Sequence, residues 1–528
     1  MSISSFTRNW GREISIGALS GLMMALSFPP YPTRVFSLFA LVPVFWYFIR
    51  EEDAGDKRSG YLKRGFLICY IFGIVFFGVL LHWVANVIPD SNVTARWVLA
   101  PGVSLLALYL ALYLGLFGLA LAYLIKRYGR GALVAAPALY PLAELLRSSG
   151  ELAFSWGLLS GALVKHPIAV QGLSIYGSYG LSFFIVLVNM LLAVALFSKQ
   201  SRIRLACLFL LVLVILFHMI FGVTRIRRYR DITGGIDREN IAVVQPNVGL
   251  DIKWKPEYKN KIFKEIENLT AEAAGRGAEL VIFPETSAPV SISRSANYRA
   301  WLQRIAAGSG VDLLIGFIDH TYSEGEIRSY NGAGLFNREG ELEARYRKIN
   351  LLPFGEKIPF SQYFPVLKKI KFGQANFTSG KRKTIFRSDA GDFGVLICYE
   401  STFPGQSREY ILNSAVFLVN ITNDGWFNSQ RGPIQHSETA ITRAVENGVY
   451  MLRSANTGVS MYIDPAGRVV RKLGLNEGGI IYCGIKEPDG LTFYTRHGNL
   501  VFYALALVSL AGAVLCRPVL ARFRRRQL

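Results

Sequence analysis

Gly394-Val395-Leu396-Ile397-Cys398-Tyr399-Glu400-Ser401 is the stretch that decides how the second half of this chain folds. Its apolar first half predicts a short buried strand that ends at a cysteine, and Pro404 follows where a helix can begin. A cysteine at the carboxyl end of a central strand is where α/β folds present a nucleophile. A lone cysteine is more often a small buried side chain, so the interpretation of Cys398 depends on its surroundings.

Strands alternate with helices on both sides of this stretch. Short apolar or β-rich runs predict strands at 241–247, 280–283, 313–316, 330–336, 341–349, 416–421 and 449–463. Helices are predicted at roughly 257–275, 296–307, 404–413 and 433–447. This alternation predicts a layered α/β domain with buried sheets at residues 223–490.

Long apolar runs give residues 1–222 a different character. The chain of 528 residues is 51% hydrophobic with a mean hydropathy of +0.30, which is too apolar for an ordinary soluble protein. Runs of spanning length lie at roughly 13–28, 34–49, 62–84, 97–125, 132–147, 173–197, 203–222 and 497–517. The first, second and fifth are short and could be tilted or re-entrant. We predict about seven membrane helices at 1–222, and one more with a basic tail at 491–528.

Basic residues predict the orientation in the membrane. The formal net charge of +21 could suggest nucleic acid, but arginine and lysine beside membrane spans explain it better. They gather before the first span, after the second, fourth and sixth spans, and in the tail: Arg8, Arg12, Arg50, Lys57, Arg58, Lys63, Arg64, Lys126, Arg127, Arg130, Lys199, Arg202, Arg204, Arg517, Arg522, Arg524, Arg525 and Arg526. Both chain ends are then cytoplasmic, and the α/β domain lies across the membrane. One cluster disagrees and is expected to meet lipid phosphates: Arg225, Arg227, Arg228 and Arg230.

The cysteines predict neither a disulfide framework nor a zinc site. The chain has five: Cys69, Cys207, Cys398, Cys483 and Cys516. Three lie in apolar runs, and no pair has CxxC or metal-ligand spacing. Attention therefore returns to Cys398 as a reactive thiol.

Three reactive residues sit at or near the ends of predicted strands. Glu285 follows Val281-Ile282-Phe283-Pro284, and Lys348 closes Arg345-Tyr346-Arg347. Alone, the glutamate could cap a helix and the lysine could be a solvated charge. Together with Cys398 they supply what acyl transfer through a thiol needs. A thiolate attacks the carbonyl, a carboxylate takes the thiol proton, and an ammonium stabilises the oxyanion, with the backbone N–H after the cysteine as a second donor.

The motifs around these residues resemble the Glu–Lys–Cys motifs of the nitrilase superfamily. They are Phe283-Pro284-Glu285, Tyr346-Arg347-Lys348, Pro353-Phe354-Gly355-Glu356 and Ile397-Cys398-Tyr399-Glu400. Joined to spans before and after the α/β domain, they resemble the apolipoprotein N-acyltransferase family over almost the whole chain. Further matching stretches are Val244-Gln245-Pro246-Asn247, Lys253-Trp254, Tyr330-Asn331-Gly332, Asn423-Asp424-Gly425-Trp426-Phe427, Gln435-His436, Arg443-Ala444-Val445-Glu446-Asn447 and Arg453-Ser454-Ala455-Asn456-Thr457-Gly458. Asn428 departs from the family, which often has glycine there.

This resemblance implies an αββα sandwich and roles for individual residues. Cys398 is the nucleophile, Glu285 the general base and Lys348 the oxyanion stabiliser. Supporting or substrate-binding roles fall to Trp254, Asn331, Glu356, Tyr399, Glu400 and Trp426. Four aromatic residues could wall the site or be plain core residues: Trp254, Tyr399, Trp426 and Phe427. The resemblance requires no metal, nucleotide or flavin cofactor.

The resemblance also implies an activity at the bacterial inner membrane. An acyl chain passes from a glycerophospholipid, expected to be phosphatidylethanolamine, to the cysteine as a thioester. The α-amine of a diacylglyceryl-cysteine at a lipoprotein's N-terminus then takes it. The catalytic domain is expected on the periplasmic side of a multi-pass, monomeric protein with no nucleic-acid partner.

Two other interpretations remain open. A membrane-tethered amidase of the same superfamily would use water as acceptor, and the triad alone cannot separate it from an acyltransferase. A transporter or receptor with a catalytically dead domain fits less well, since the reactive residues are intact and the spans hold little charge.

Some marked residues lie outside the triad. Glu144 and Arg147 could form a functional pair in the membrane or snorkel to its surface. Asp251 and Lys253 are expected to be solvated loop charges, and His436 to pack or to form hydrogen bonds.

Overall fold

The computed structural model describes residues 3–53, 60–87, 96–233, 238–323, 325–364, 366–367 and 376–525. Two compact units divide the chain. Unit 1 comprises Met1–Ala85, Arg96–Thr224 and His497–Leu528, and unit 2 comprises Asn86–Ala95 and Arg225–Arg496. Three of the predicted orienting charges, Lys57, Arg58 and Arg526, lie outside the described residues.

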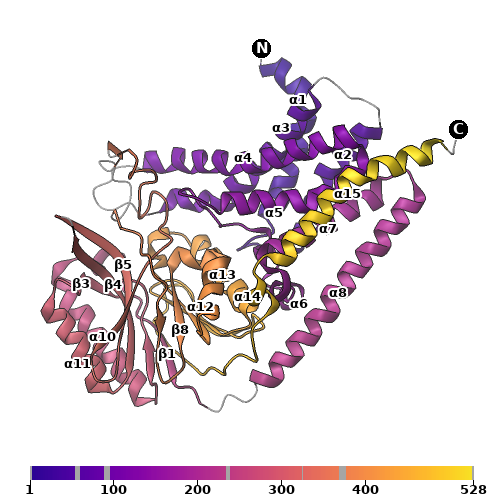
Figure 1. The fold of residues 1–528 in the computed structure, drawn as a ribbon. Coiled ribbons are helices and arrows are strands. Elements are labelled where there is room, and N and C mark those ends of the chain that lie inside the picture. The colour runs from indigo at the N-terminus through magenta and orange to yellow at the C-terminus, as the bar shows by residue number, and fades with distance from the viewer. Residues whose placement is uncertain are drawn as a thin grey trace. The chain divides into compact units, whose positions relative to one another are not determined.

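Unit 1 is built from helices (Figure 1). The longer ones are α1 (Ile3–Ala25), α3 (Tyr61–Leu81), α4 (Arg96–Tyr128), α7 (Leu173–Phe197), α8 (Ser201–Thr233, which enters unit 2) and α15 (Leu500–Arg525). The shorter ones are η1 (Arg34–Leu38), α2 (Val42–Asp53), η2 (His82–Asn86), η3 (Arg130–Ala135), α5 (Ala136–Arg147), η4 (Leu159–Leu163) and α6 (Pro167–Val170). The second and fifth apolar runs thus contain only short α-helices.

Four helices in the described part of the chain are long and apolar enough to cross a membrane. They are Tyr61–Asn86, Pro101–Tyr128, Leu173–Phe197 and Ser201–Arg230, and Leu500–Leu515 is a shorter apolar helix. Membrane-spanning character is therefore confirmed for several predicted runs, while the count of about eight stays a prediction.

Small residues let the helices of unit 1 approach closely. A Cβ atom on Gly21 of α1 would lie 2.5 Å from the carbonyl oxygen of Phe72 in α3. A Cβ atom on Gly118 of α4 would lie 2.2 Å from the carbonyl oxygen of Gly65 in α3. Such contacts drive helix association where the surroundings are as apolar as the helices themselves.

Glu144 and Arg147 organise the chain that follows α5. Both are buried, with 1% of each residue exposed. Arg147 donates to the carbonyl oxygens of Phe154 (2.6 Å) and Trp156 (2.8 Å), and Glu144 accepts from the N–H of Leu159 (2.8 Å). The alternative in which they snorkel to the surface is therefore wrong, because both charged groups point into the protein.

Unit 2 contains two sheets. The first is seven-stranded with the order β13-β1-β2-β4-β5-β6, and β3 pairs with β4. Its strands are β1 (Ile241–Gln245), β2 (Leu280–Ile282), β3 (Ala288–Ser291), β4 (Asp312–Ser323), β5 (Glu326–Phe336), β6 (Leu342–Arg347) and β13 (Gly479–Cys483). The second is six-stranded with the order β12-β11-β10-β9-β8-β7. Its strands are β7 (Ile385–Phe386), β8 (Phe393–Ile397), β9 (Phe417–Thr422), β10 (Met451–Ala455), β11 (Ser460–Ile463) and β12 (Val469–Leu473).

The sheets stack face to face between two layers of helices (Figure 1). Ser454 of β10 crosses between them, with its hydroxyl 2.8 Å from the carbonyl oxygen of Val244 and 3.3 Å from that of Ile282. The helices of unit 2 are α9 (Leu250–Lys253), η5 (Pro256–Tyr258), α10 (Lys259–Gly275), α11 (Ala296–Ser309), η7 (Cys398–Thr402), α12 (Pro404–Leu412), η8 (Asp424–Phe427), α13 (Arg431–Asn447) and α14 (Phe493–His497). The helices α10 and α11 cover the first sheet, and α12 and α13 the second. The predicted layered α/β arrangement is confirmed.

Strand direction brings the reactive ends together. In the second sheet β8 and β10 both run parallel to β9, and in the first sheet β1 and β4 both run parallel to β2. Two antiparallel pairings, β4 with β5 and β5 with β6, make β6 run in the direction of β4. The carboxyl ends of β2 and β6 therefore meet at one edge of their sheet.

Candidate active site

Cys398 lies where β8 ends and η7 begins, as the sequence predicts. Its φ angle is +50°, a left-handed conformation that costs a residue with a side chain about 1–3 kcal/mol. Buried residues surround it, yet Cys398 itself stays partly exposed. The strained turn thus ends the buried strand at the cysteine.

Glu285 follows β2 after two residues and is 7% exposed. Its carboxylate accepts from the side-chain amide of Asn331 (2.6 Å) and from the N–H of Asn423 (2.9 Å). Gly316 of β4 makes room for this loop, because a Cβ atom there would lie 2.7 Å from the Cα atom of Glu285. The carboxylate is therefore fixed in place by groups from both sheets.

Lys348 comes directly after β6 and is 1% exposed. Its ammonium lies 2.9 and 2.8 Å from the two carboxylate oxygens of Glu356 and 3.8 Å from Glu285 Oε1. The amide of Asn331 also donates to Glu356 (2.9 Å). Lys348 and Asn331 thus each contact both buried carboxylates, Glu285 and Glu356.

Electrostatics couple this cluster to the thiol. Burial disfavours the Lys348 ammonium, but Glu356, Cys398 and Glu285 outweigh it, so the pKa of Lys348 is raised. Burial, followed by the Glu285 carboxylate, raises the pKa of the Cys398 thiol, and Lys348 opposes that rise. The resting cysteine is therefore a thiol at neutral pH, and its attack requires a base.

Glu400 and Tyr399 shape the turn that follows the thiol. Glu400 is fully buried and accepts from the N–H groups of Ile397 (2.8 Å) and Ile349 (2.8 Å) and from the hydroxyl of Tyr346 (2.7 Å). It therefore ties the end of β8 to the residues on both sides of Lys348. Tyr399 is 3% exposed and is a core aromatic.

The predicted aromatic residues lie beside the site in half-buried positions. Trp254, Trp426 and Phe427 each keep part of their surface exposed, which fits a wall better than a core. The indole N–H of Trp426 lies 3.3 Å from the side-chain amide of Asn423, whose main chain holds Glu285. Asn428 has a φ angle of +42°, so the substitution for glycine uses a residue that tolerates this conformation.

The expectation for Lys253 is wrong. Its side chain is 2% exposed, with the ammonium nitrogen 3.3 Å from the carbonyl oxygen of Glu285. Burial lowers the pKa of Lys253 to about 7, although Glu285 opposes that shift. Asp251 is exposed as expected. The sequence did hold one sign that Lys253 belongs to the site, because it lies beside Trp254 in a stretch that resembles the family. The polar composition of the surrounding segment favoured a solvated loop instead.

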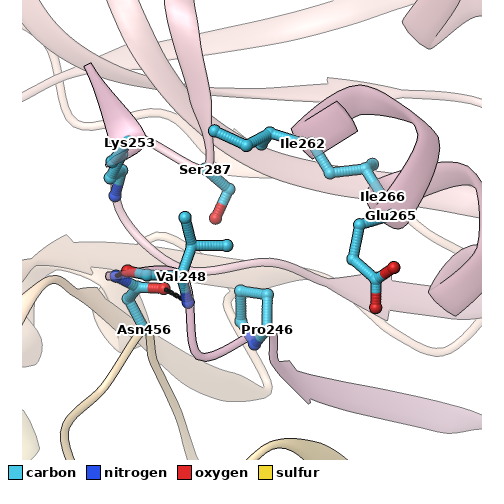
Figure 2. Close-up of a pocket in the computed structure, with 8 residues that line it drawn as sticks. All are labelled: Pro246, Val248, Lys253, Ile262, Glu265, Ile266, Ser287 and Asn456. Atoms are coloured by element: carbon cyan, nitrogen blue, oxygen red, sulfur yellow. Dashed lines mark hydrogen bonds between the residues drawn. The ribbon is translucent and has the colours of Figure 1, made fainter. Parts of the chain in front are cut away.

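A small cleft reaches the same lysine (Figure 2). It is lined by Pro246, Val248, Lys253, Ile262, Glu265, Ile266, Ser287 and Asn456. α10 supplies one side, and Lys253 lies on the other. The side-chain oxygen of Asn456 accepts from the N–H of Val248 (3.0 Å), which holds the rim together.

A second buried network lies behind the cysteine. The ring nitrogens of His436 lie 2.8 Å from Asp424 Oδ1 and 3.0 Å from the carbonyl oxygen of Cys398, and Arg453 lies 2.7 Å from Asp424 Oδ2. Arg453 and His436 outweigh the effect of burial and lower the pKa of Asp424 to about 2. Burial, with Arg453, lowers the pKa of His436. The expectation that His436 forms hydrogen bonds is confirmed, but the sequence did not reveal that its partner is the cysteine.

Among the described residues, metal-ligating atoms gather at this same place. One ligand atom each from Cys398, Asp424 and His436 lies within 4.8 Å of the others. Both ring nitrogens and both carboxylate oxygens already have partners within the protein. The group therefore fits a hydrogen-bonded network better than a metal site.

Two family profiles match this chain. The profile of the carbon-nitrogen hydrolases matches residues 240–489, and that of the apolipoprotein N-acyltransferase N-terminal domain matches residues 20–191. The first includes the whole candidate site, and the second covers most of the helices that precede it.

Relatives of the same organisation match over nearly their whole length. An apolipoprotein N-acyltransferase of Bradyrhizobium diazoefficiens is 31% identical, over 98% of this chain and 96% of its own. One from Geobacter metallireducens is 28% identical over the same shares of the two chains. Among solved structures, a nitrilase-superfamily amidase from Nesterenkonia sp. AN1 is 21% identical with a TM-score of 0.39, over 51% of this chain and 98% of its own.

Proposed function

The chain belongs to the apolipoprotein N-acyltransferase family, and from this premise we propose how its site N-acylates lipoproteins. It is an acyltransferase of the bacterial inner membrane, with a phospholipid as donor and a lipoprotein as acceptor. The observation that carries the proposal is the position of Cys398 on a strained strand end beside Glu285 and Lys348. Thioester chemistry fits because one thiol can serve two bulky lipid substrates in turn.

The first half-reaction loads the enzyme. Cys398 Sγ attacks the carbonyl carbon of a phospholipid ester while Glu285 takes the thiol proton. The Lys348 ammonium and the N–H of Tyr399 stabilise the oxyanion that forms. The carbon–oxygen bond then breaks, Glu285 returns the proton to the leaving alkoxide, and a lysophospholipid departs. The acyl chain remains on the cysteine as a thioester.

The second half-reaction unloads it. The α-amine of a diacylglyceryl-cysteine attacks the thioester, and Glu285 takes a proton from the amine as the new bond forms. The carbon–sulfur bond breaks, and the proton returns to the thiolate. The product is an amide, and the free thiol of Cys398 is restored. Water must be kept out between the steps, a role that the half-buried Trp254, Trp426 and Phe427 can serve.

Three supporting residues fix the positions of the reactive groups. Asn331 links the Glu285 and Glu356 carboxylates, and both carboxylate oxygens of Glu356 contact the Lys348 ammonium. Glu400 fixes the turn at the nucleophile. These contacts support assigning positioning roles to Asn331, Glu356 and Glu400.

Finer features belong to the same proposal. The donor is phosphatidylethanolamine, used at its sn-1 ester, and the enzyme works as a monomer. Membrane helices occupy 1–222 and 491–528, about eight in number, and the catalytic domain lies between them in sequence, at 223–490. That domain faces the periplasm, where lipoproteins await maturation.

The rival function is a membrane-tethered hydrolase of the same superfamily. It would form the same thioester and discharge it to water, so geometry at the triad does not separate the two. The match of residues 20–191 to the N-acyltransferase N-terminal domain favours the acyltransferase.

Intact-protein mass spectrometry tests the proposal. The purified enzyme is incubated with phosphatidylethanolamine, and a diacylated lipopeptide is then added. We expect a mass gain of one acyl group, which is absent in Cys398→Ala and which moves to the amine of the peptide. An adduct that becomes free fatty acid in the presence of peptide would instead establish the hydrolase. A wild-type enzyme that forms no adduct with any phospholipid would contradict both.

A further inference from the structure

The carbonyl oxygen of Cys398 is held from behind. His436 Nε2, on α13, lies 3.0 Å from it, and Asn420 Nδ2, on β9, lies 3.5 Å away. Ser401 Oγ is a third polar neighbour, 3.3 Å from the same ring nitrogen. The histidine therefore makes the shorter of the two side-chain contacts to this carbonyl.

The histidine ring cannot easily turn away. Its Nδ1 atom lies 2.8 Å from Asp424 Oδ1, and Asp424 in turn is bound by Arg453 (2.7 Å) and by the hydroxyl of Thr422 (2.9 Å). His436 and Arg453 are fully buried, and Asp424 is 2% exposed. With Nδ1 held in this way, Nε2 is directed at Cys398. The donor role at Cys398 requires the ring hydrogen on Nε2, so Nδ1 of the neutral ring is an acceptor, and the guanidinium of Arg453, 3.1 Å from Nδ1, is the donor that it faces.

The held carbonyl shares its peptide group with the proposed second oxyanion donor. The Cys398 carbonyl and the Tyr399 N–H belong to one planar unit, in which the two groups point in opposite directions. Fixing the oxygen therefore fixes the direction of the hydrogen. We propose that His436 is a positioning residue that orients the Cys398–Tyr399 peptide so that its N–H meets the oxyanion of acyl transfer. This inference rests on the proposed function.

The position of Cys398 makes such an anchor necessary. Its φ angle of +50° is disfavoured for a residue with a side chain, so the turn needs contacts that oppose relaxation. A rotated peptide would turn a carbonyl oxygen toward the developing negative charge and repel it. Asn420 at 3.5 Å is too distant to prevent that rotation alone.

Two variants of matched shape test the role. His436→Met removes the donor, and His436→Gln keeps an N–H at the end of a chain of the same length. The rate of Cys398 acylation by phosphatidylethanolamine is measured in a single turnover by intact-protein mass spectrometry. Alkylation of Cys398 by iodoacetamide is measured in parallel, because that reaction forms no oxyanion. We expect acylation to fall about 100-fold in His436→Met and to stay within about 10-fold of wild type in His436→Gln. Alkylation should stay within about threefold in both.

Thr442→Val serves as the matched control, because Thr442 is a buried polar residue on the same helix that donates within it. Wild-type acylation by His436→Met would overturn the inference, and so would an equal fall of acylation and alkylation. If His436→Met does not fold, Asp424→Asn is used, for which we expect acylation about 10-fold slower with unchanged alkylation. A wild-type rate in that variant would also overturn the inference. Absence of an adduct in the wild type would instead contradict the proposed function.

Discussion

At the scale of single residues, the site depends on the unequal contacts that the Lys348 ammonium makes with the carboxylates of Glu356 and Glu285. Lys348 contacts both oxygens of Glu356 at 2.8–2.9 Å and Glu285 only at 3.8 Å. Glu356 therefore satisfies most of the lysine's charge. Glu285, whose oxygens accept from two amide N–H groups instead, is left able to accept a proton. The sequence pointed to all three residues, but the contacts that give Glu285 and Glu356 different environments needed the structure.

Glu356→Gln should leave Glu285 as the only carboxylate near the Lys348 ammonium among the contacts described above. With the carboxylate removed, the Lys348 ammonium should move toward Glu285 and weaken it as a base. We expect kcat for N-acylation to fall about 100-fold with little change in KM. Steady-state kinetics with a fluorescent lipopeptide would measure both. Glu265→Gln, an exposed glutamate at the cleft in Figure 2, is the control and should behave as wild type. An effect of Glu356→Gln on KM alone would contradict this view.

Lys253 predicts a dependence of stability on pH. Burial lowers its pKa to about 7, while an unfolded lysine titrates near 10.4. Between these values the unfolded state binds a proton that the folded state does not, so the free energy of unfolding rises with pH across the window. The slope is at most about 1.4 kcal/mol per pH unit.

Lys253→Met should remove this slope and should unfold at a higher temperature than wild type at pH 7. Thermal unfolding followed by tryptophan fluorescence from pH 7 to pH 10 would measure the difference, which should shrink as pH rises. Lys255→Met, at an exposed lysine close by, should leave the profile unchanged. A constant offset between Lys253→Met and wild type at every pH would contradict a lowered pKa.

At the scale of elements, β8 is positioned by close packing as well as by pairing. Gly394 lies within the strand, and a Cβ atom there would lie 2.3 Å from the ring of Tyr410 on α12. The ring therefore packs directly on the backbone that carries Cys398 toward its turn. Only glycine allows α12 to lie so close to the strand.

Gly394→Ala should therefore destabilise unit 2 by about 1–3 kcal/mol, because overpacking forces the strand and helix apart. The midpoint of thermal unfolding and the rate of adduct formation should both fall. Gly405→Ala is the matched control on α12, since nothing lies within 4 Å of a Cβ atom at that position. Alanine there should be neutral or slightly stabilising. Equal stabilities of the two variants would show that the contact with Tyr410 carries no strain.

Elements with a strong apolar period could be predicted from sequence, and others could not. The strand before Cys398 and the helix begun by Pro404 lie where the sequence placed them. β12 and β13 were not predicted, and both lie at an edge of their sheets; β13 does carry the short apolar run Ile480-Ile481. β12 lies at the edge of its sheet and carries Arg471 and Lys472, which resemble loop charges in sequence. Pairing partners far along the chain, such as β1 for β13, make these segments strands.

At the scale of the whole molecule, the proposed orientation depends on where the basic residues lie. The cluster in the last turns of α8 opposed the pattern, but Arg225 and Arg228 have partners in unit 2. Arg225 donates to the hydroxyl of Tyr229 (3.0 Å), and Arg228 forms an ion pair with Asp489. Charges that serve the folded domain are weaker topological signals than charges in short loops. The cluster is therefore compatible with a catalytic domain on the periplasmic side.

Cysteine labelling can establish that orientation. Glu257→Cys and Arg127→Cys introduce thiols at exposed positions, one in unit 2 and one at the basic end of α4, in a background that carries Cys398→Ala and Cys516→Ala. A membrane-impermeant maleimide is added to cells with a permeabilised outer membrane, before and after the inner membrane is broken. We expect Glu257→Cys to react before lysis and Arg127→Cys only after it, because positive loops are retained in the cytoplasm. The background protein should stay unlabelled, since Cys69 and Cys483 are buried and Cys207 lies within the apolar α8. The reverse order would place the thioester on the cytoplasmic side and invert the whole chain. Labelling of both positions at the same stage would instead require an odd change in the number of spans between residues 127 and 257.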